Sequence, residues 1–216
     1  MMIRSMISVL TAVCGLLSCS FAFAQTQKPA AKEQKSTTEP RTATESKLQV
    51  EGIISAVVDD LWKETDQYWH HGDYYRIIAL CRLSVEADSS FNEAYTGGAY
   101  LIWSLGDAVG ADDFLSYGID HTTQKTALYQ DLGRHFNATK RYEAAEKYLR
   151  IATSRPDAGP LAYSQLAYSY KNQKKYPQLV ATWEAVVKKF PGFPSGPPNL
   201  ASAKALAASS SAETKP

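Results

Sequence analysis

The sequence predicts an all-α fold in which consecutive pairs of antiparallel helices stack against one another. First, a pattern of aromatic and small residues between Thr126 and Phe193 occurs twice, with an offset of 34 residues. Second, the same 34-residue frame extends back to Val58, so four units of equal length follow one another without insertion or deletion. Third, one such pair of short helices cannot bury its apolar stripes alone, whereas a stack of pairs covers them.

The four predicted units are residues 58–91, 92–125, 126–159 and 160–193, each with a first and a second helix. Three positions of the first helix recur: Leu61, Tyr95, Tyr129 and Tyr163; Thr65, Ala99, Gly133 and Ala167; and Tyr68, Ile102, Phe136 and Tyr170. Small side chains let neighbouring helices approach and large ones fill the remaining space, so these positions are expected to form the core. A charge at Leu149, in the second helix of the third unit, should therefore be strongly destabilising.

Residues 58–193 resemble the tetratricopeptide repeat family at these recurring positions and at their turns. The matching turns are Gly72-Asp73-Tyr74, Gly106-Asp107 and the closing Phe190-Pro191. Two residues depart from the family pattern, since Glu64 and Gly98 stand where the family usually has leucine. The resemblance implies a right-handed α-solenoid of four tetratricopeptide helix-turn-helix units with a short C-terminal capping helix.

Local signals give further helix boundaries. Ser90 followed by Glu93 predicts a capping box at the start of the second unit. Pro160 and Pro177 are expected in the first turns of the two helices of the fourth unit, where a missing backbone N–H leaves no helix hydrogen bond unmade.

Residues 1–24 have the layout of a secretory signal peptide. An apolar run ends in Ala22-Phe23-Ala24, a small-x-small cleavage site before Gln25. Two alternatives stay open: an uncleaved anchor, and a lipoprotein box at Leu16-Leu17-Ser18-Cys19 in which Cys19 is acylated. The protein is therefore expected to be exported, periplasmic or secreted after cleavage near Ala24, or alternatively anchored by the lipid.

The segments that flank the repeats differ from them in composition. Residues 25–47 contain no aromatic or branched aliphatic residue, which predicts a disordered low-complexity linker. Residues 48–57 are apolar and predict a leading segment that runs into the first helix and covers the open end of the stack. After the last unit, residues 194–208 predict a Pro/Gly connector followed by a capping helix at 199–208, and residues 209–216 predict a disordered tail.

The sequence carries no pattern of catalysis. There is no phosphate-binding glycine loop, dinucleotide fingerprint, nucleophile elbow or zinc-binding helix, so no enzyme activity, cofactor or metal site is expected. A net charge of +1 gives no reason to expect a nucleic-acid partner. The histidines are expected to be exposed or half-buried and the paired acids solvated: His70, His71, His121 and His135, and Asp59-Asp60 and Asp112-Asp113. Cys81, the cysteine that follows the signal segment, is expected to be a small buried core residue.

The remaining candidate for function is a surface. In the family that this chain resembles, the first helices line a concave groove, and fixed unit positions face it. The residues expected to bind a partner there are Trp62, Asp66, Trp69, Tyr100, Trp103, Gln130, Arg134, Asn137, Tyr168 and Lys171. Aromatic rings would anchor the partner, because they provide large contact area with little entropy loss. An alternative stays open, in which the tryptophans pack against residues 48–57 and belong to the core.

The sequence therefore predicts a non-catalytic protein–protein interaction scaffold of the bacterial cell envelope. Its expected partner is another protein, bound as a segment or helix in the groove, with membrane contact only through a possible lipid at Cys19. The first alternative is a membrane-tethered lipoprotein that is a structural component of an envelope assembly or secretion complex. The second is an enzyme or a protein that binds a small molecule, which no motif supports.

Overall fold

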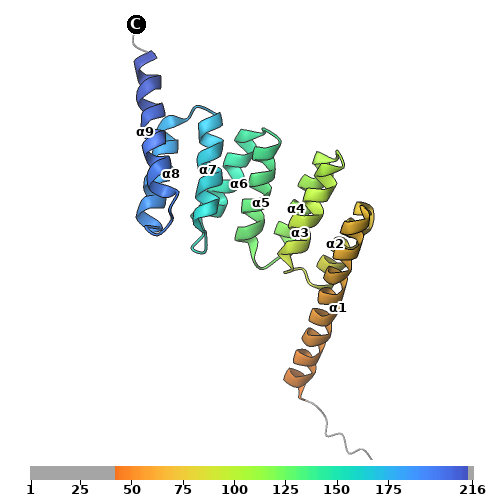
Figure 1. Ribbon diagram of the computed structural model, residues 1–216. Helices are drawn as coiled ribbons and strands as arrows, with labels where there is room; N and C mark the ends of the chain where they lie inside the picture. Colours follow the sequence, from red (N-terminus) through yellow and green to blue (C-terminus); the bar gives the residue numbers. More distant parts are fainter. Residues whose placement is uncertain (1–41, 214–216) are drawn as a thin grey trace, which may run out of the picture. The chain divides into compact units, whose positions relative to one another are not determined.

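The computed structural model describes residues 42–213, and these residues form nine α-helices and no strand (Figure 1). The helices are α1 (Ala43–His71), α2 (Tyr74–Ala87), α3 (Asn92–Ser104), α4 (Ala108–His121), α5 (Lys125–Ala138), α6 (Tyr142–Ser154), α7 (Pro160–Asn172), α8 (Tyr176–Lys189) and α9 (Gly196–Glu213). Each helix packs against the next along the chain, α3 also contacts α5, and α5 also contacts α7. The expected stack of helix pairs is therefore present.

None of the helices in residues 42–213 combines the length and the apolar character needed to cross a bilayer. The signal segment, Cys19 and most of the expected linker lie outside the described residues.

The turn inside each helix pair repeats with the same geometry. A residue in the left-handed backbone region ends each first helix, at Gly72, Gly106, Lys140 and Lys174, with φ of 71°, 98°, 60° and 57°. In the first pair, the N–H of Gly72 donates to the carbonyl of Trp69, and the N–H of Asp73 donates to the carbonyl of Tyr68. The other three turns make the equivalent hydrogen bonds. This is the Schellman arrangement, and it fixes the start of every second helix two residues later.

Two of these left-handed positions hold lysine rather than glycine. A side chain at positive φ is strained because its Cβ crowds the backbone. Lys140→Gly and Lys174→Gly are each expected to raise the free energy of unfolding by about 0.5 kcal/mol, since the relief of strain exceeds the added entropy of the unfolded chain. Urea denaturation measures the change, and the reverse substitution Gly106→Lys should lower the stability. Destabilisation by the glycine variants would contradict this view of the turn.

The core lies between the first and second helices and between adjacent pairs. Leu128, Leu132 and Leu149 are fully buried, and the small residues Ala99 and Ala167 are buried as expected. At Gly98, where the family usually has leucine, the Phe114 side chain of α4 comes close to the backbone of α3. A Cβ built there would lie 2.6 Å from the Phe114 ring. In this pair the ring from the second helix occupies the space that a larger residue at position 98 would fill.

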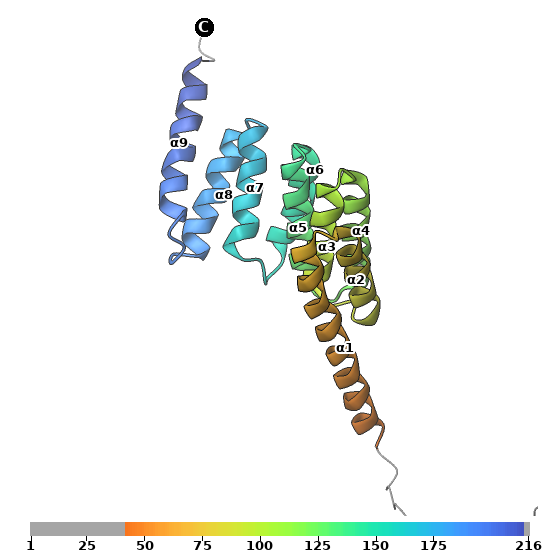
Figure 2. The same cartoon turned by 45° about the vertical axis from the view of Figure 1, so that its right-hand side comes forward.

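Helix α1 is longer than the sequence suggested, and it corrects two expectations. It begins at Ala43, with Thr42 and Glu45 forming a capping box, so residues 43–47 are helical and the predicted linker does not reach Lys47. Residues 48–57 continue the same helix past the end of α2 (Figures 1 and 2). Leu48, Val50 and Ile53 are exposed. This segment therefore does not fold back over the tryptophans.

The C-terminal helix α9 also differs from its expected bounds of 199–208. It starts at Gly196, and Pro197 and Pro198 occupy its first turn, where helix N–H groups have no intrahelical acceptor. It packs along α8 with Ala203 buried and an ion pair of 3.0 Å between Lys204 and Glu184. The first part of the predicted disordered tail is thus helical, and residues 214–216 lie outside the described residues.

The predicted capping box at Ser90 is wrong, whereas both proline positions are confirmed. Helix α3 begins at Asn92 after Phe91, and no side chain caps it. The Ser90 hydroxyl instead lies 3.1 Å from the Thr123 hydroxyl of the next unit. Pro160 and Pro177 do stand in the first turns of α7 and α8.

Two tyrosines at the same unit position differ in how their hydroxyls are satisfied. Tyr95 is fully buried and its hydroxyl has no hydrogen-bond partner among residues 42–213, and burial raises its pKa to about 12. The hydroxyl of Tyr163 donates to the carbonyl of Thr153 at 2.9 Å and accepts from Lys189 at 2.6 Å. An unpaired buried hydroxyl opposes folding, whereas a paired one contributes.

Removing these hydroxyls should therefore have opposite effects. Tyr95→Phe is expected to leave stability unchanged or raise it by about 1 kcal/mol, and Tyr163→Phe is expected to lower it by about 1 kcal/mol. Thermal unfolding of both variants against the parent protein measures the contrast. Equal losses in the two variants would show that the Tyr95 hydroxyl has a partner in solution.

Candidate partner-binding groove

A groove of about 490 Å³ separates α1 from α3. Its walls carry three exposed rings, Trp62 and Trp69 from α1 and Tyr100 from α3, and its floor includes Ile77 and Leu101. The rings lie on one side of α1 because positions 62 and 69 are two helical turns apart. Hydrophobic and aromatic side chains are the usual lining of ligand-binding clefts in proteins.

Cys81 also lines the floor of this groove, and it is buried as expected. Burial raises the pKa of its thiol to about 11. The thiol therefore stays protonated near neutral pH, and only the thiolate is an effective nucleophile. Cys81 accordingly contributes apolar surface to the groove.

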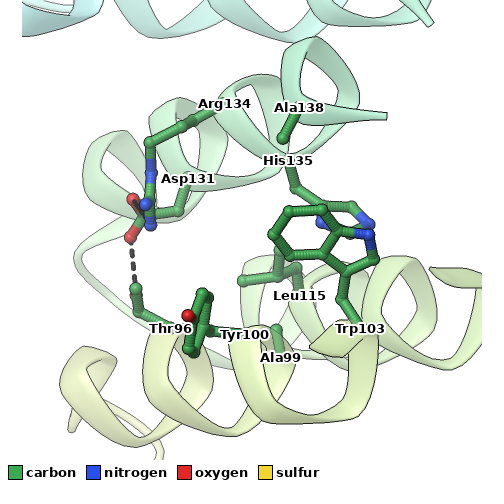
Figure 3. A pocket seen from close by; sticks show the side chains of 9 residues that line it. All are labelled: Thr96, Ala99, Tyr100, Trp103, Leu115, Asp131, Arg134, His135 and Ala138. Carbon is green, nitrogen blue, oxygen red and sulfur yellow. Dashed lines mark hydrogen bonds and ion pairs between the residues drawn. The ribbon is translucent and has the colours of Figure 1, made fainter. Parts of the chain in front are cut away.

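A second hollow lies between α3 and α5 and is shown in Figure 3. Tyr100 and Trp103 project from α3 toward Arg134 and His135 of α5, and the Trp103 and His135 rings meet edge to face at 5.7 Å. Asp131 joins the two helices by accepting a hydrogen bond from the Thr96 hydroxyl at 2.6 Å. Tyr100 lines both hollows, so they lie next to each other across α1, α3 and α5. We refer to the two hollows together as the first-helix groove.

The structure brings six of the ten expected partner-binding residues to the first-helix groove. They are Trp62, Asp66, Trp69, Tyr100, Trp103 and Arg134. Tyr168 and Lys171 are exposed on α7, and Gln130 is half-buried on α5, and none of these three lines either hollow. The candidate site is therefore concentrated on the first three units.

Asn137 is a correction, because it is buried and faces the next unit. Its side-chain amide donates to the carbonyl of Gln165 at 3.0 Å, and its side-chain oxygen accepts from the Ser169 hydroxyl at 2.8 Å. These bonds join α5 to α7. Asn137 therefore has a structural role and is not available to a partner.

His135 and Asp112 also depart from their expected environments. His135 is buried, and its Nε2 lies 2.9 Å from a carboxylate oxygen of Asp112. The same carboxylate accepts two hydrogen bonds from the Arg141 guanidinium. The prediction of an exposed or half-buried histidine and a solvated acid is thus wrong here. The cluster ties α4 and α5 to Arg141, the N-cap residue of α6, at the edge of the groove.

Several groove residues were not predicted from the fixed unit positions that face the groove in the family. These positions cover only the first helices, so the prediction omitted Ile77 and Cys81, which reach the floor from α2. It also omitted Asp131 and His135 on α5. The available signal was the spacing from Arg134 to Asp131 and from Asp131 to His135, since residues three or four positions apart share one side of a helix. No group of histidine, cysteine and carboxylate side chains in residues 42–213 is arranged to hold a metal ion.

Comparison with solved structures defines the fold. A structure of MamA matches with a TM-score of 0.55 and 18% sequence identity, covering 71% of this chain and 84% of that chain. PilF of Pseudomonas aeruginosa matches with a TM-score of 0.55 and 18% sequence identity, covering 69% of this chain and 68% of that chain. MamA from Desulfovibrio magneticus RS-1, from residue 41 to its end, matches with a TM-score of 0.51 and 12% sequence identity. This match covers 71% of this chain and 92% of that chain. These are tetratricopeptide repeat proteins, and this chain has the tetratricopeptide repeat fold. No protein-family model and no curated protein matches the sequence.

Proposed function

We propose that this chain is a non-catalytic protein–protein interaction scaffold that holds a segment or helix of another protein in its first-helix groove. The observation that carries the proposal is the row of exposed rings Trp62, Trp69 and Tyr100 along one apolar groove. Tryptophan and tyrosine are enriched among the residues that dominate binding energy at protein interfaces. Burying these rings against a partner removes apolar surface from water.

The polar residues of the groove give such a partner its orientation. Arg134 is exposed on α5, held by Asp131 at 3.1 Å, and its remaining N–H groups can donate to a carboxylate or carbonyl of the bound segment. A groove across three helices offers at most a standard interface of about 800 Å² per partner, which corresponds to moderate affinity.

The place of action is proposed to be the bacterial cell envelope. This part of the proposal is supported by the signal-like composition of residues 1–24. The second candidate function, a lipid-tethered structural component of an envelope assembly, is favoured by Cys19 in its lipoprotein-like context. Mass spectrometry of the mature N-terminus distinguishes them, because the first gives free Gln25 and the second gives acylated Cys19.

The double variant Trp62→Ala/Tyr100→Ala tests the groove. Affinity capture from the source cells with the parent protein should retain a defined partner, and the double variant should lose it by about tenfold or more, since two aromatic anchors are removed. Tyr75→Ala is the matched control, because Tyr75 is an exposed ring on α2 that does not line the groove. Circular dichroism must show equal helicity in all three proteins. Retention of the partner by the double variant would refute the proposed function.

A further inference from the structure

We propose that the α1–α3 part of the first-helix groove receives an arginine side chain of the bound protein segment. Its guanidinium would lie at Asp66 and against the aromatic rings, and its aliphatic stem would lie over the apolar floor. This inference rests on the proposed function and specifies the chemistry of the partner.

The rings that line the groove are held in place but remain open to solvent. Each has an edge-on aromatic neighbour: Trp62 with Phe91 at 5.2 Å between centroids, Trp69 with Tyr74 at 5.6 Å, and Tyr100 with Trp103 at 6.1 Å. Trp62, Trp69 and Tyr100 nonetheless remain 36%, 50% and 51% exposed. Rings that are fixed before binding lose little entropy when a ligand side chain stacks on them.

These rings carry no cation of the chain itself. Elsewhere in residues 42–213 the protein does place its own cations over rings, for example Arg76 over Tyr68 at 5.1 Å and Arg82 over Phe114 at 5.0 Å. Within the same residues, no lysine or arginine lies over the three groove rings. Their electron-rich faces are thus available to a cation from outside, and a guanidinium suits them because it is planar and weakly hydrated.

The charges at the groove favour a cationic guest. The Asp66 side chain is 79% exposed, and the ion pair it makes within the described residues is with His70, at 3.7 Å. Lys63 also lines the groove, and its Nζ lies 3.2 Å from Asp60, which does not line the groove. Asp66 is the carboxylate that lines this hollow above the apolar floor, and the Lys63 ammonium pairs with Asp60. A side chain with a long apolar stem and a cationic head matches both features.

Peptide titration tests this inference with a defined probe. Three blocked nonapeptides differ only at the central residue, arginine, glutamine or leucine, between flanking leucines, and tryptophan fluorescence of the purified protein reports binding. The arginine peptide should bind at least about tenfold more tightly than the glutamine peptide, because only it makes the charged and cation–π contacts. Equal or tighter binding of the leucine peptide, or no saturable signal with the arginine peptide, would overturn the inference.

Asp66→Asn provides the matching test on the protein side. It should reduce the preference for the arginine peptide to less than about threefold, whereas Asp113→Asn, an exposed acid on α4 outside the groove, should leave the preference unchanged. The two proposals fail in different ways. A captured partner that depends on Trp62 and Tyr100 but not on Asp66 would refute the arginine site alone. A captured partner whose binding does not depend on Trp62 and Tyr100 would refute the groove itself.

Discussion

Leu149→Asp is expected to destabilise the protein by at least about 3 kcal/mol. Leu149 is fully buried in α6 where it packs against Gly133 of α5, and Gly133 has no side chain that could move aside. Aspartate loses the apolar contacts of leucine and places a carboxylate in a fully buried position, away from water. Urea denaturation followed by circular dichroism measures the loss in the free energy of unfolding. A variant that already has reduced helicity at 25 °C also agrees with the prediction.

Arg150→Asp is the control because it places the same side chain one residue further along α6, at an exposed position, while also removing a positive charge. The Arg150 side chain is 68% exposed, and its pair with Glu146 is long, at 4.0 Å. The new carboxylate stays in water, so the expected loss is no more than about 1 kcal/mol. Similar losses in the two variants would show that Leu149 is not a core position, which would undermine the 34-residue frame.

The stack itself could be predicted because its information is local and repeated. Each unit carries rings and small residues at the same positions, and the structure starts the second helices at Tyr74, Ala108, Tyr142 and Tyr176 as the frame requires. The longer first helix was also available from sequence, since Thr42 and Glu45 have the spacing of a capping box. Composition alone suggested disorder there, and the local capping signal was the better guide.

Parts of the site could not be predicted because they depend on contacts between units. Asp112 comes from α4, His135 from α5 and Arg141 from the N-cap of α6, and nothing near any of them in the sequence signals the others. Asn137 occupies a unit position that faces the groove in the family, but its polar side chain finds Gln165 on the next first helix and turns to it. Trp69 at the equivalent position of the first unit remains exposed and lines the groove.

A second large effect is expected at Gly118, on α4. A Cβ built there would lie 2.6 Å from Leu128 and 2.8 Å from the ring of Tyr95, and both of these side chains are fully buried. Gly118→Ala should therefore destabilise by about 2 kcal/mol, because forcing α4 away from α3 and α5 costs more than the improved helix propensity of alanine gains. Thermal and urea unfolding measure the change.

Gly52→Ala is the control for helix propensity, since it makes the same substitution in the exposed part of α1. A Cβ built there meets no atom within 4 Å. Alanine should accordingly stabilise by about 0.5–1 kcal/mol, by favouring the helix without a clash. Opposite signs for the two glycines would show that Gly118 is required by the close approach of three helices. If Gly118→Ala also stabilised, α4 would have to pack more loosely on Tyr95 and Leu128 than the structure shows.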